Sequence, residues 1–351
     1  MKLSFRRFDL RLAHAWSVSS NAATGGKDFY PAVFVELSDD AGRRGLGEVA
    51  PSARYDETTD TVIAFLQKVD AARLSFDDVP RSMAYLESVG PGFFAAKCAL
   101  NVALLDAVAA HAGQALHDFW ELGFTEGRHV TSFSIGIASP EKIREKVLAA
   151  APFPILKLKV GAPNDRANLA ALREAAPEKP VRVDANEAWR TKEEALRNIE
   201  WLAADGRIQF VEQPMPASSD LADLRWLRER SPLPLFADES YQGPGDAARC
   251  AECFHGVNVK LAKTGGLTGA REALQGALRA GMQTMLGCMI ESSLLISAAA
   301  HLAELTDHLD LDGILLITND PYRGVTAERG VISFAGARRK IGLCVDEKPA
   351  A

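Results

Sequence analysis

The sequence is poor in cysteine: only five of its 351 residues are cysteines. Cys250 and Cys253 form a C-x-x-C pair, but no second pair and no nearby histidine completes a zinc site. Metal binding or redox chemistry at this pair is the minor alternative. Sparse thiols without a pairing pattern favour a reduced, cytoplasmic protein.

Long apolar runs and an excess of basic charge are also lacking. The most apolar helical stretch, 294–305, is interrupted by His301 and Glu304 and is too short to cross a bilayer. Residues 1–16 carry scattered charges and no apolar core, so we expect no signal peptide. The net charge is −6, from 40 basic and 46 acidic residues, with no basic block. These features argue against membrane and nucleic-acid partners.

What is present is an ordinary globular composition, 47% hydrophobic and 25% charged, with enough chain for a large core. Residues 1–50 show the alternation of β-strands, interrupted by a polar loop at 17–27. The pattern then changes to the helical period, with helices predicted at 58–74 and 93–111. Strands followed by helices indicate an α+β unit.

From about residue 130, short apolar strands alternate with amphipathic helices, and about eight such units are right for a closed (β/α) barrel. The predicted strands are 131–136, 155–160, 180–184, 209–212, 233–238, 256–260, 283–286 and one near 309–317. The predicted helices are 140–150, 165–176, 192–204, 220–230, 246–253, 267–280 and 292–305.

Three successive barrel strands end in an acid: Asp184, Glu212 and Asp238, which are 28 and 26 residues apart. Successive βα units bring strand ends to one rim of a barrel, where active sites lie. A single acid at a strand end is more often a helix cap. Three in register would repel one another without a cation, and they suit a hard divalent ion, most plausibly Mg²⁺.

Lysines flank these acids on both sides. Lys157 and Lys159 face the same way on one strand, which would lower the pKa of at least one of them and make it a candidate base. A K-x-K pair alone is more typical of a solvated strand face. Lys260, however, follows one strand after Asp238. A substrate carboxylate on the metal would have a lysine on each face of its α-carbon, so we expect proton removal and return through a metal-stabilised enediolate.

The combined motifs resemble the muconate-lactonising-enzyme subgroup of the enolase superfamily. The matching motifs are Lys157-x-Lys159, Asp184-Ala-Asn, Glu212-Gln-Pro, Ala-Asp238-Glu-Ser and Val-Lys260-Leu-x-Lys-Thr-Gly-Gly. The resemblance extends to the first part of the chain, where Arg54-Tyr55-Asp56-Glu57-Thr58 matches. The resemblance implies an α/β fold with a modified (β/α)₇β TIM barrel at 126–322 and an α+β capping domain built from 1–125 and the returning tail 323–351. It also implies one Mg²⁺ per subunit on the three acids, Lys159 and Lys260 as the acid/base catalysts, and Lys157 as their electrostatic neighbour.

Within the subgroup the chain looks most like the dipeptide epimerases. One feature is the 287–293 segment, Gly-Cys-Met-Ile-Glu-Ser-Ser, and another is the pair Asp310-x-Asp312, which resembles the carboxylates that hold a substrate's α-ammonium group. Met289 and Ser134 match further substrate-contacting positions. The resemblance implies an isomerase that inverts the α-carbon of the C-terminal residue of a dipeptide, and a homo-oligomer.

One departure concerns the loop at 17–30, which in Ala-Glu epimerases is expected to supply an arginine; here Lys27 is its only cation. An alternative within the superfamily is o-succinylbenzoate synthase or N-succinylamino-acid racemase. Their substrates lack a free ammonium group, so Asp310 and Asp312 would have no role. A catalytically silent barrel used for binding is a third hypothesis, under which Lys159 and Lys260 could be replaced without loss of function.

Overall fold

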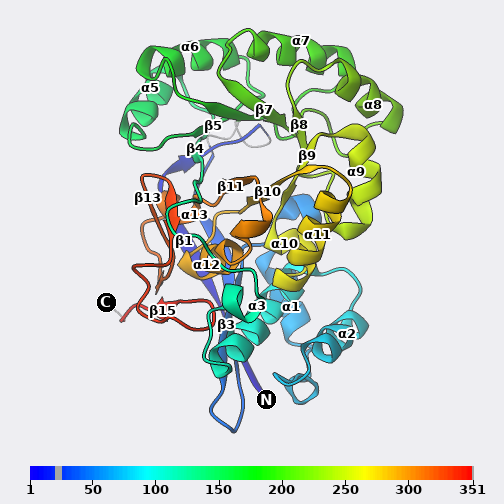
Figure 1. The fold of residues 1–351 in the computed structure, drawn as a ribbon, viewed down its shortest axis with the longest axis vertical. Helices are drawn as coiled ribbons and strands as arrows, with labels where there is room; N and C mark the ends of the chain where they lie inside the picture. The colour runs from blue at the N-terminus through cyan, green and yellow to red at the C-terminus, as the bar shows by residue number, and fades with distance from the viewer. Residues whose placement is uncertain (20–25, 350–351) are drawn as a thin grey trace.

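The computed structural model describes residues 1–19 and 26–349. Residues 20–25, within the polar loop predicted at 17–27, lie outside the described residues. In Figure 1 the chain divides into a lower part formed by the N-terminal strands and helices and an upper part formed by strands surrounded by helices. The lower part caps one end of the upper part.

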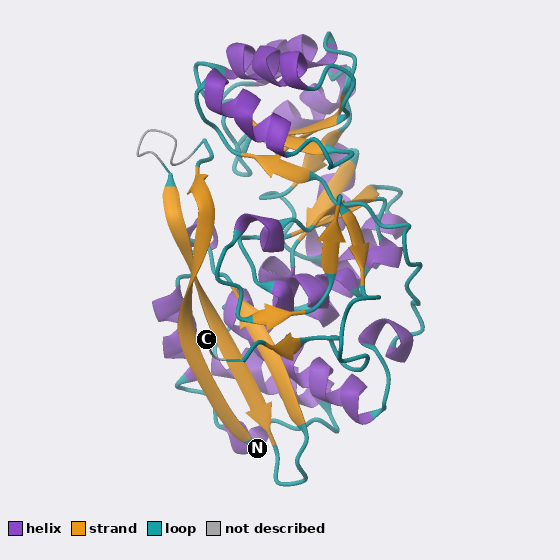
Figure 2. Cartoon of the chain, turned by 90° about the vertical axis from the view of Figure 1, so that its left-hand side faces the viewer, coloured by secondary structure: helices purple, strands orange, loops and turns teal. Residues whose placement is uncertain are grey.

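The capping part begins with a three-stranded antiparallel sheet in the order β1 (Lys2–Trp16), β2 (Lys27–Ser38) and β3 (Arg44–Val49). The turn between β2 and β3 is closed by a hydrogen bond from the Asp39 amide to the Arg43 carbonyl oxygen. Figure 2 shows β1 and β2 as a long twisted ribbon along one side of the molecule, reaching from the capping part towards the barrel.

Four helices follow the sheet: α1 (Thr59–Leu66), α2 (Val79–Val89), α3 (Phe94–His111) and α4 (Leu116–Phe119). The helix predicted at 93–111 therefore corresponds to α3. The helix predicted at 58–74 was too long, because α1 ends at Leu66 and only a 3₁₀ turn, Ala71–Arg73, follows it. Helix α2 was not predicted, although Asp78 caps its first turn by accepting a hydrogen bond from the Arg81 amide.

The barrel is one sheet of eight parallel strands, in the order β11-β10-β9-β8-β7-β6-β5-β4. The strands are β4 (Phe133–Ile135), β5 (Leu156–Lys159), β6 (Val181–Asp184), β7 (Ile208–Glu212), β8 (Leu235–Ala237), β9 (Gly256–Val259), β10 (Gln283–Gly287) and β11 (His308–Asp310). Thr131, just before β4, forms a parallel bridge with Leu309 of β11. This bridge joins the two edge strands, and the predicted barrel with a capping domain is confirmed.

Helices cover the outside of the barrel (Figure 1). They are α5 (Pro140–Ala149), α6 (Asp165–Ala175), α7 (Lys192–Ala203), α8 (Leu221–Arg230), α9 (Ala247–Cys253), α11 (Leu267–Arg279) and α12 (Ser293–Ala300). The helix predicted at 292–305 ends early, at Ala300. The single turn α10 (Leu261–Thr264) was not predicted, because it is only four residues long. It ends at Gly265, which has a left-handed φ of 75°.

The last predicted strand, near 309–317, was wrong beyond its first residues. Strand β11 ends at Asp310, and a short helix α13 (Gly313–Leu316) follows. Asp312 sits between them with φ −94° and ψ 4°, which is not an extended conformation. Strand parity therefore does not fix the relative direction of the Asp310 and Asp312 side chains.

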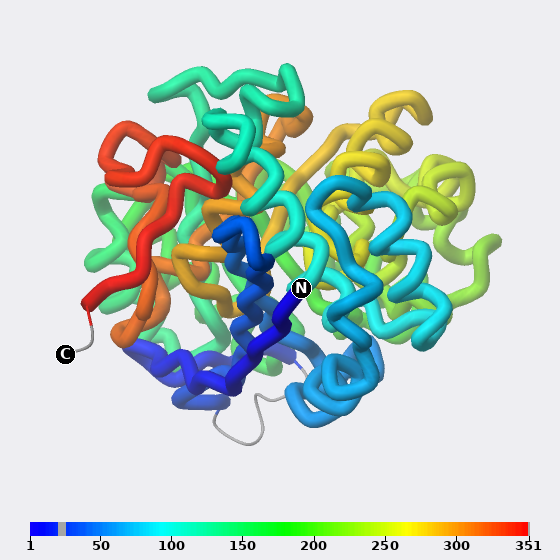
Figure 3. Tube along the Cα trace, turned by 90° about the horizontal axis from the view of Figure 1, so that it is seen from below, coloured from blue at the N-terminus to red at the C-terminus, as the bar shows by residue number. Residues whose placement is uncertain are grey.

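The C-terminal tail lies against the segments that surround α3. Its strands pair as β12 (Tyr322–Arg323) with β15 (Asp346–Glu347) and as β13 (Thr326–Glu328) with β14 (Val331–Ser333). Buried Asp106 of α3 accepts hydrogen bonds from the amides of Leu343 in the tail and Leu46 in β3, at 2.9 and 3.0 Å. In Figure 3 the red tail runs beside the segment that follows α3. The exact domain limits, 125/126 and 322/323, stay a prediction.

A buried carboxylate joins the capping sheet to the barrel. Glu48 of β3 accepts hydrogen bonds from the amides of Ser292 and Leu295, at 2.9 and 3.1 Å, at the start of α12. Burial raises the pKa of Glu48 to about 8, although these hydrogen bonds favour the charged form. The first turn of a helix has free N–H groups and a partial positive charge, so a carboxylate from the other part of the molecule stabilises it.

Helix α3 is the one described helix that is long and apolar enough to cross a membrane by length and composition alone. In the structure 78% of its 18-residue window is buried inside the protein, as in a core helix. Its close neighbour is β3, where a Cβ added at Gly47 would lie 1.9 Å from the Ala99 carbonyl oxygen.

We therefore expect Gly47→Ala to lower the free energy of unfolding by about 1–3 kcal/mol, because the added methyl group has to push α3 away from β3. Urea unfolding followed by circular dichroism measures this change. Gly243→Ala is the matched control: its φ is −176° and no atom lies within 4 Å of the added Cβ. Equal stability of the two variants would contradict the close packing of α3 on β3.

Candidate active site

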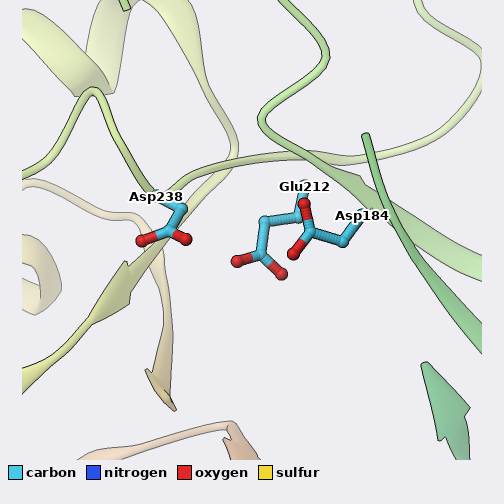
Figure 4. Close-up of side chains that lie close together, drawn as sticks. All are labelled: Asp184, Glu212 and Asp238. Atoms are coloured by element: carbon cyan, nitrogen blue, oxygen red, sulfur yellow. The ribbon is translucent and has the colours of Figure 1, made fainter. Parts of the chain in front are cut away.

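Three neighbouring strand ends carry the predicted metal ligands. Asp184 ends β6 and Glu212 ends β7, and the two residues are paired in register. Asp238 directly follows β8. One ligand oxygen from each residue lies within 4.8 Å of the other two, and all three residues are buried. Figure 4 shows the three side chains converging.

Lys159 and Lys260 lie at opposite ends of this acidic triad. Lys159 ends β5, in register with Asp184, and its Nζ lies 2.5 Å from Asp184 Oδ2. Lys260 directly follows β9, and its Nζ lies 2.7 Å from Asp238 Oδ2. Strands β5 and β9 flank the three triad strands in the sheet order. The structure thus brings the five residues together at one rim of the barrel.

Lys157 lies inside the barrel among carboxylates. Its Nζ is 2.6 Å from Asp310 Oδ2, 2.7 Å from Glu212 Oε2 and 3.1 Å from Asp184 Oδ2. Burial would lower the pKa of Lys157, but the charges of these three carboxylates together raise it well above its usual value. The expected depression concerned at least one lysine of the pair, and it does not occur at Lys157, because three acids outweigh one base.

Burial disfavours the ionised form of all three acids, and the neighbouring lysines offset this to different degrees. Burial, and next the charge of Asp184, raise the pKa of Glu212 to about 7, although Lys157 opposes this shift. Burial also works against ionised Asp238, but Lys260 and Lys263 hold its pKa below the usual range. Three buried carboxylates with converging oxygens form a donor set that fits a hard divalent cation such as Mg²⁺.

Asp310 and Asp312 are both buried but have different partners. Asp310 binds Lys157 and accepts a 2.7 Å hydrogen bond from Ser132 Oγ; burial opposes its charge, but Lys157 and Lys159 lower its pKa to about 2. Asp312 accepts a 2.7 Å hydrogen bond from the Ser134 amide. Burial, followed by the charge of Asp310, raises the pKa of Asp312 to about 6. A cationic group beside Asp312 would therefore be stabilised.

The remaining predicted positions are Ser134, which lies on β4, and Met289, which lies on the loop after β10. Met289 follows β10, and its amide donates a 2.9 Å hydrogen bond to Glu291 Oε1. Ser19 Oγ donates to the carbonyl oxygen of Asn186, two residues beyond Asp184. A cavity of about 430 Å³ lies next to this contact and is lined by Gly161 and Asn186, among others. None of the three triad acids lines this cavity.

The C-x-x-C pair lies on α9, outside the site. Both Cys250 and Cys253 are buried, and their sulfur atoms contact the carbonyl oxygens of Ser240 and Leu221. Burial raises the pKa of both thiols. Such thiols are poor nucleophiles.

Several residues that contact the site were not predicted as site residues. Lys263 belongs to the quoted Lys260 motif but was given no role, although its spacing was visible. Asn258 lies two residues before Lys260 and donates a 2.7 Å hydrogen bond from Nδ2 to Glu212 Oε1, which strand parity would have suggested. Tyr55 comes from the capping part; burial and then the charge of nearby Asp238 raise its pKa. Tyr55 belongs to the quoted 54–58 motif but was given no role.

Comparisons with known proteins identify the family that this chain resembles. Residues 141–328 match the family described as "Enolase C-terminal domain-like". The chain is 60% identical to the L-Ala-D/L-amino acid epimerase of Pedosphaera parvula, over 99% of this chain and 100% of the relative.

Two solved structures are similar over nearly the whole chain. One is the substrate-liganded complex of the L-Ala-D/L-Glu epimerase from Bacillus subtilis, with a TM-score of 0.89 at 27% identity, covering 98% of this chain and 97% of that one. The other is the dipeptide epimerase from Cytophaga hutchinsonii complexed with Mg and the dipeptide D-Ala-L-Val. The TM-score of this second structure is 0.90 at 28% identity, and the matched region covers 99% of this chain and 95% of the chain in that structure.

We expect Lys157→Met to lower the free energy of unfolding by about 3–5 kcal/mol in the presence of a chelator, because three buried carboxylates lose their shared cation. Added Mg²⁺ should recover part of the loss, since a second cation then offsets the same charges. Urea unfolding with chelator and with Mg²⁺ measures both effects. Exposed Lys142→Met is the control and should stay within about 0.5 kcal/mol of the wild type. A Lys157→Met protein as stable as this control would refute the charge balance described for the site.

Proposed function

Because the chain belongs to the enolase C-terminal domain-like family, we propose that it is a dipeptide epimerase that inverts the α-carbon of the C-terminal residue of its substrate. The prediction of an isomerase is confirmed by the relatives, which are named as epimerases. The small-molecule substrate and the two-lysine mechanism are parts of this proposal.

The observation that carries the proposal is the position of Lys159 and Lys260 at the two ends of the acidic triad. Each Nζ contacts a different outer carboxylate, Asp184 for Lys159 and Asp238 for Lys260. A substrate carboxylate at the triad would lie between them, with its α-carbon within reach of an amine from either side. Removal of a proton by one lysine and delivery by the other, from the opposite face, inverts the stereocentre.

Asp184, Glu212 and Asp238 would hold Mg²⁺. When bound, the ion supplies positive charge that stabilises the negative charge left on the substrate as the α-proton leaves. In each direction of the reaction, one of Lys159 and Lys260 acts as the base and the other as the acid. The two roles are exchanged when the reaction runs in the opposite direction. Lys157, held by Asp310 as well as by the triad, stays charged and adds to the positive potential at the site.

Asp312 is the proposed partner of the substrate's α-ammonium group. Its Oδ2 accepts a bond from the Ser134 amide, which fixes the carboxylate at the barrel mouth. Because burial and Asp310 raise the pKa of Asp312 to about 6, an ammonium ligand would favour its ionised form. An N-acylated amino acid offers no such cation, which favours a dipeptide over an N-succinylamino acid.

The side chain of the inverted residue is proposed to be uncharged or variable. Residues 17–30 contain no arginine, and the Nζ of Lys27 lies 5.0 Å from the ring centre of Tyr30. Nothing in this loop sequence therefore favours glutamate in particular. The broad name of the P. parvula relative, L-Ala-D/L-amino acid epimerase, fits this proposal.

The experiment is an incubation of the enzyme with Mg²⁺ in D₂O, with a library of dipeptides and a matched library of N-acetyl and N-succinyl amino acids. Mass spectrometry reads deuterium at the α-carbon. We expect label in dipeptides, in their C-terminal residue, and loss of labelling with excess chelator. Label confined to the N-acyl compounds would favour the N-succinylamino-acid racemase instead, and no label in either library would overturn the proposed chemistry.

A further inference from the structure

Lys263 is a fourth lysine at the triad, and the proposed reaction does not use it. It lies in α10, one turn beyond Lys260, and its side chain is fully buried. Its Nζ lies 2.6 Å from Asp238 Oδ1, 2.6 Å from the Asp238 carbonyl oxygen and 2.9 Å from the Asn258 carbonyl oxygen. A lysine ammonium has three N–H donors, so each donor has an acceptor.

Lys263 differs from its neighbour Lys260 in how many of its N–H donors are used. Among the described residues, Lys260 Nζ donates to one acceptor, Asp238 Oδ2, which leaves two donors for a substrate. Lys263 would have to break contacts with two backbone carbonyl groups before it could reach another molecule. These two contacts and the one to Asp238 Oδ1 together hold Lys263 in place.

The contacts of Lys263 reach two of the three triad acids. Asp238 is held directly, through its side chain and its main chain. Asn258 is held through its carbonyl oxygen, and its side-chain Nδ2 donates to Glu212 Oε1 at 2.7 Å. One ammonium group therefore connects the end of β8 with β9, and through Asn258 with the end of β7.

We propose that Lys263 is a positioning residue that fixes Asp238 directly, and Glu212 through Asn258, in the arrangement that binds the divalent cation. It exchanges no proton with the substrate. The inference rests on the proposed function only in taking the acidic triad as the cation site. Lys263 also occupies Asp238 Oδ1, so that the carboxylate is held even when Lys260 turns towards the substrate.

The test is Mn²⁺ binding to the full-length protein without substrate, read from the electron paramagnetic resonance signal of free Mn²⁺. We expect Lys263→Met to raise the dissociation constant about 10- to 100-fold, the usual effect of losing a group that orients a metal ligand. Lys97→Met is the matched control, because Lys97 is a buried lysine of α3 paired with Glu87. It should lose stability without a change in Mn²⁺ affinity.

Asn258→Ala is the second variant, for the case that Lys263→Met does not fold. It removes the contact to Glu212 but keeps the main-chain acceptor of Lys263, so we expect a smaller rise in the dissociation constant. Wild-type Mn²⁺ affinity in a folded Lys263→Met protein, or in Asn258→Ala if the first does not fold, would overturn the inference. So would a wild-type protein that binds no Mn²⁺. Weakened Mn²⁺ binding in a protein that labels no substrate would support the positioning role and refute only the proposed reaction.

Discussion

Buried negative charge at the mouth of the barrel is the constraint on which the rest of the site depends. Four carboxylates, including Asp310, converge where water is excluded, and each needs a cation. Four lysines supply it: Lys157, Lys159, Lys260 and Lys263. Removing one partner of such a pair leaves an uncompensated buried charge. The strands must therefore end in register, because the charges balance only when the strand ends meet at one rim.

The four lysines divide by how firmly they are held. Lys157 and Lys263 each contact three oxygens and serve as fixed charges. Among the residues that the structure describes, Lys159 and Lys260 each donate to one carboxylate at the edge of the triad and keep further donors for a substrate. Fixed cations keep the acids in place without taking part in proton transfer. The ligands sit at strand ends rather than in long loops, and the capping sheet is bound to the barrel through Glu48, so the geometry is supported from both sides.

Much of this arrangement could be predicted from the sequence, since a regular βα repeat sends strand ends to one rim and thereby groups Asp184, Glu212 and Asp238. Three features could not. The charge on Lys157 depends on acids from three other strands, β6, β7 and β11. Asp312 lies just beyond the end of β11, where strand parity no longer applies. Tyr55 approaches from the capping part, and no local pattern relates the two parts of the chain.

The central claim is that two lysines act on opposite faces of one carbon, and stereospecific exchange of the α-proton in D₂O tests it most directly. Both epimers of a dipeptide substrate would be incubated with the Lys159→Ala and Lys260→Ala proteins and followed by NMR. Each variant should label one epimer only, a different one for each lysine, and neither should invert it. Inversion that persists in either variant would contradict the two-lysine account.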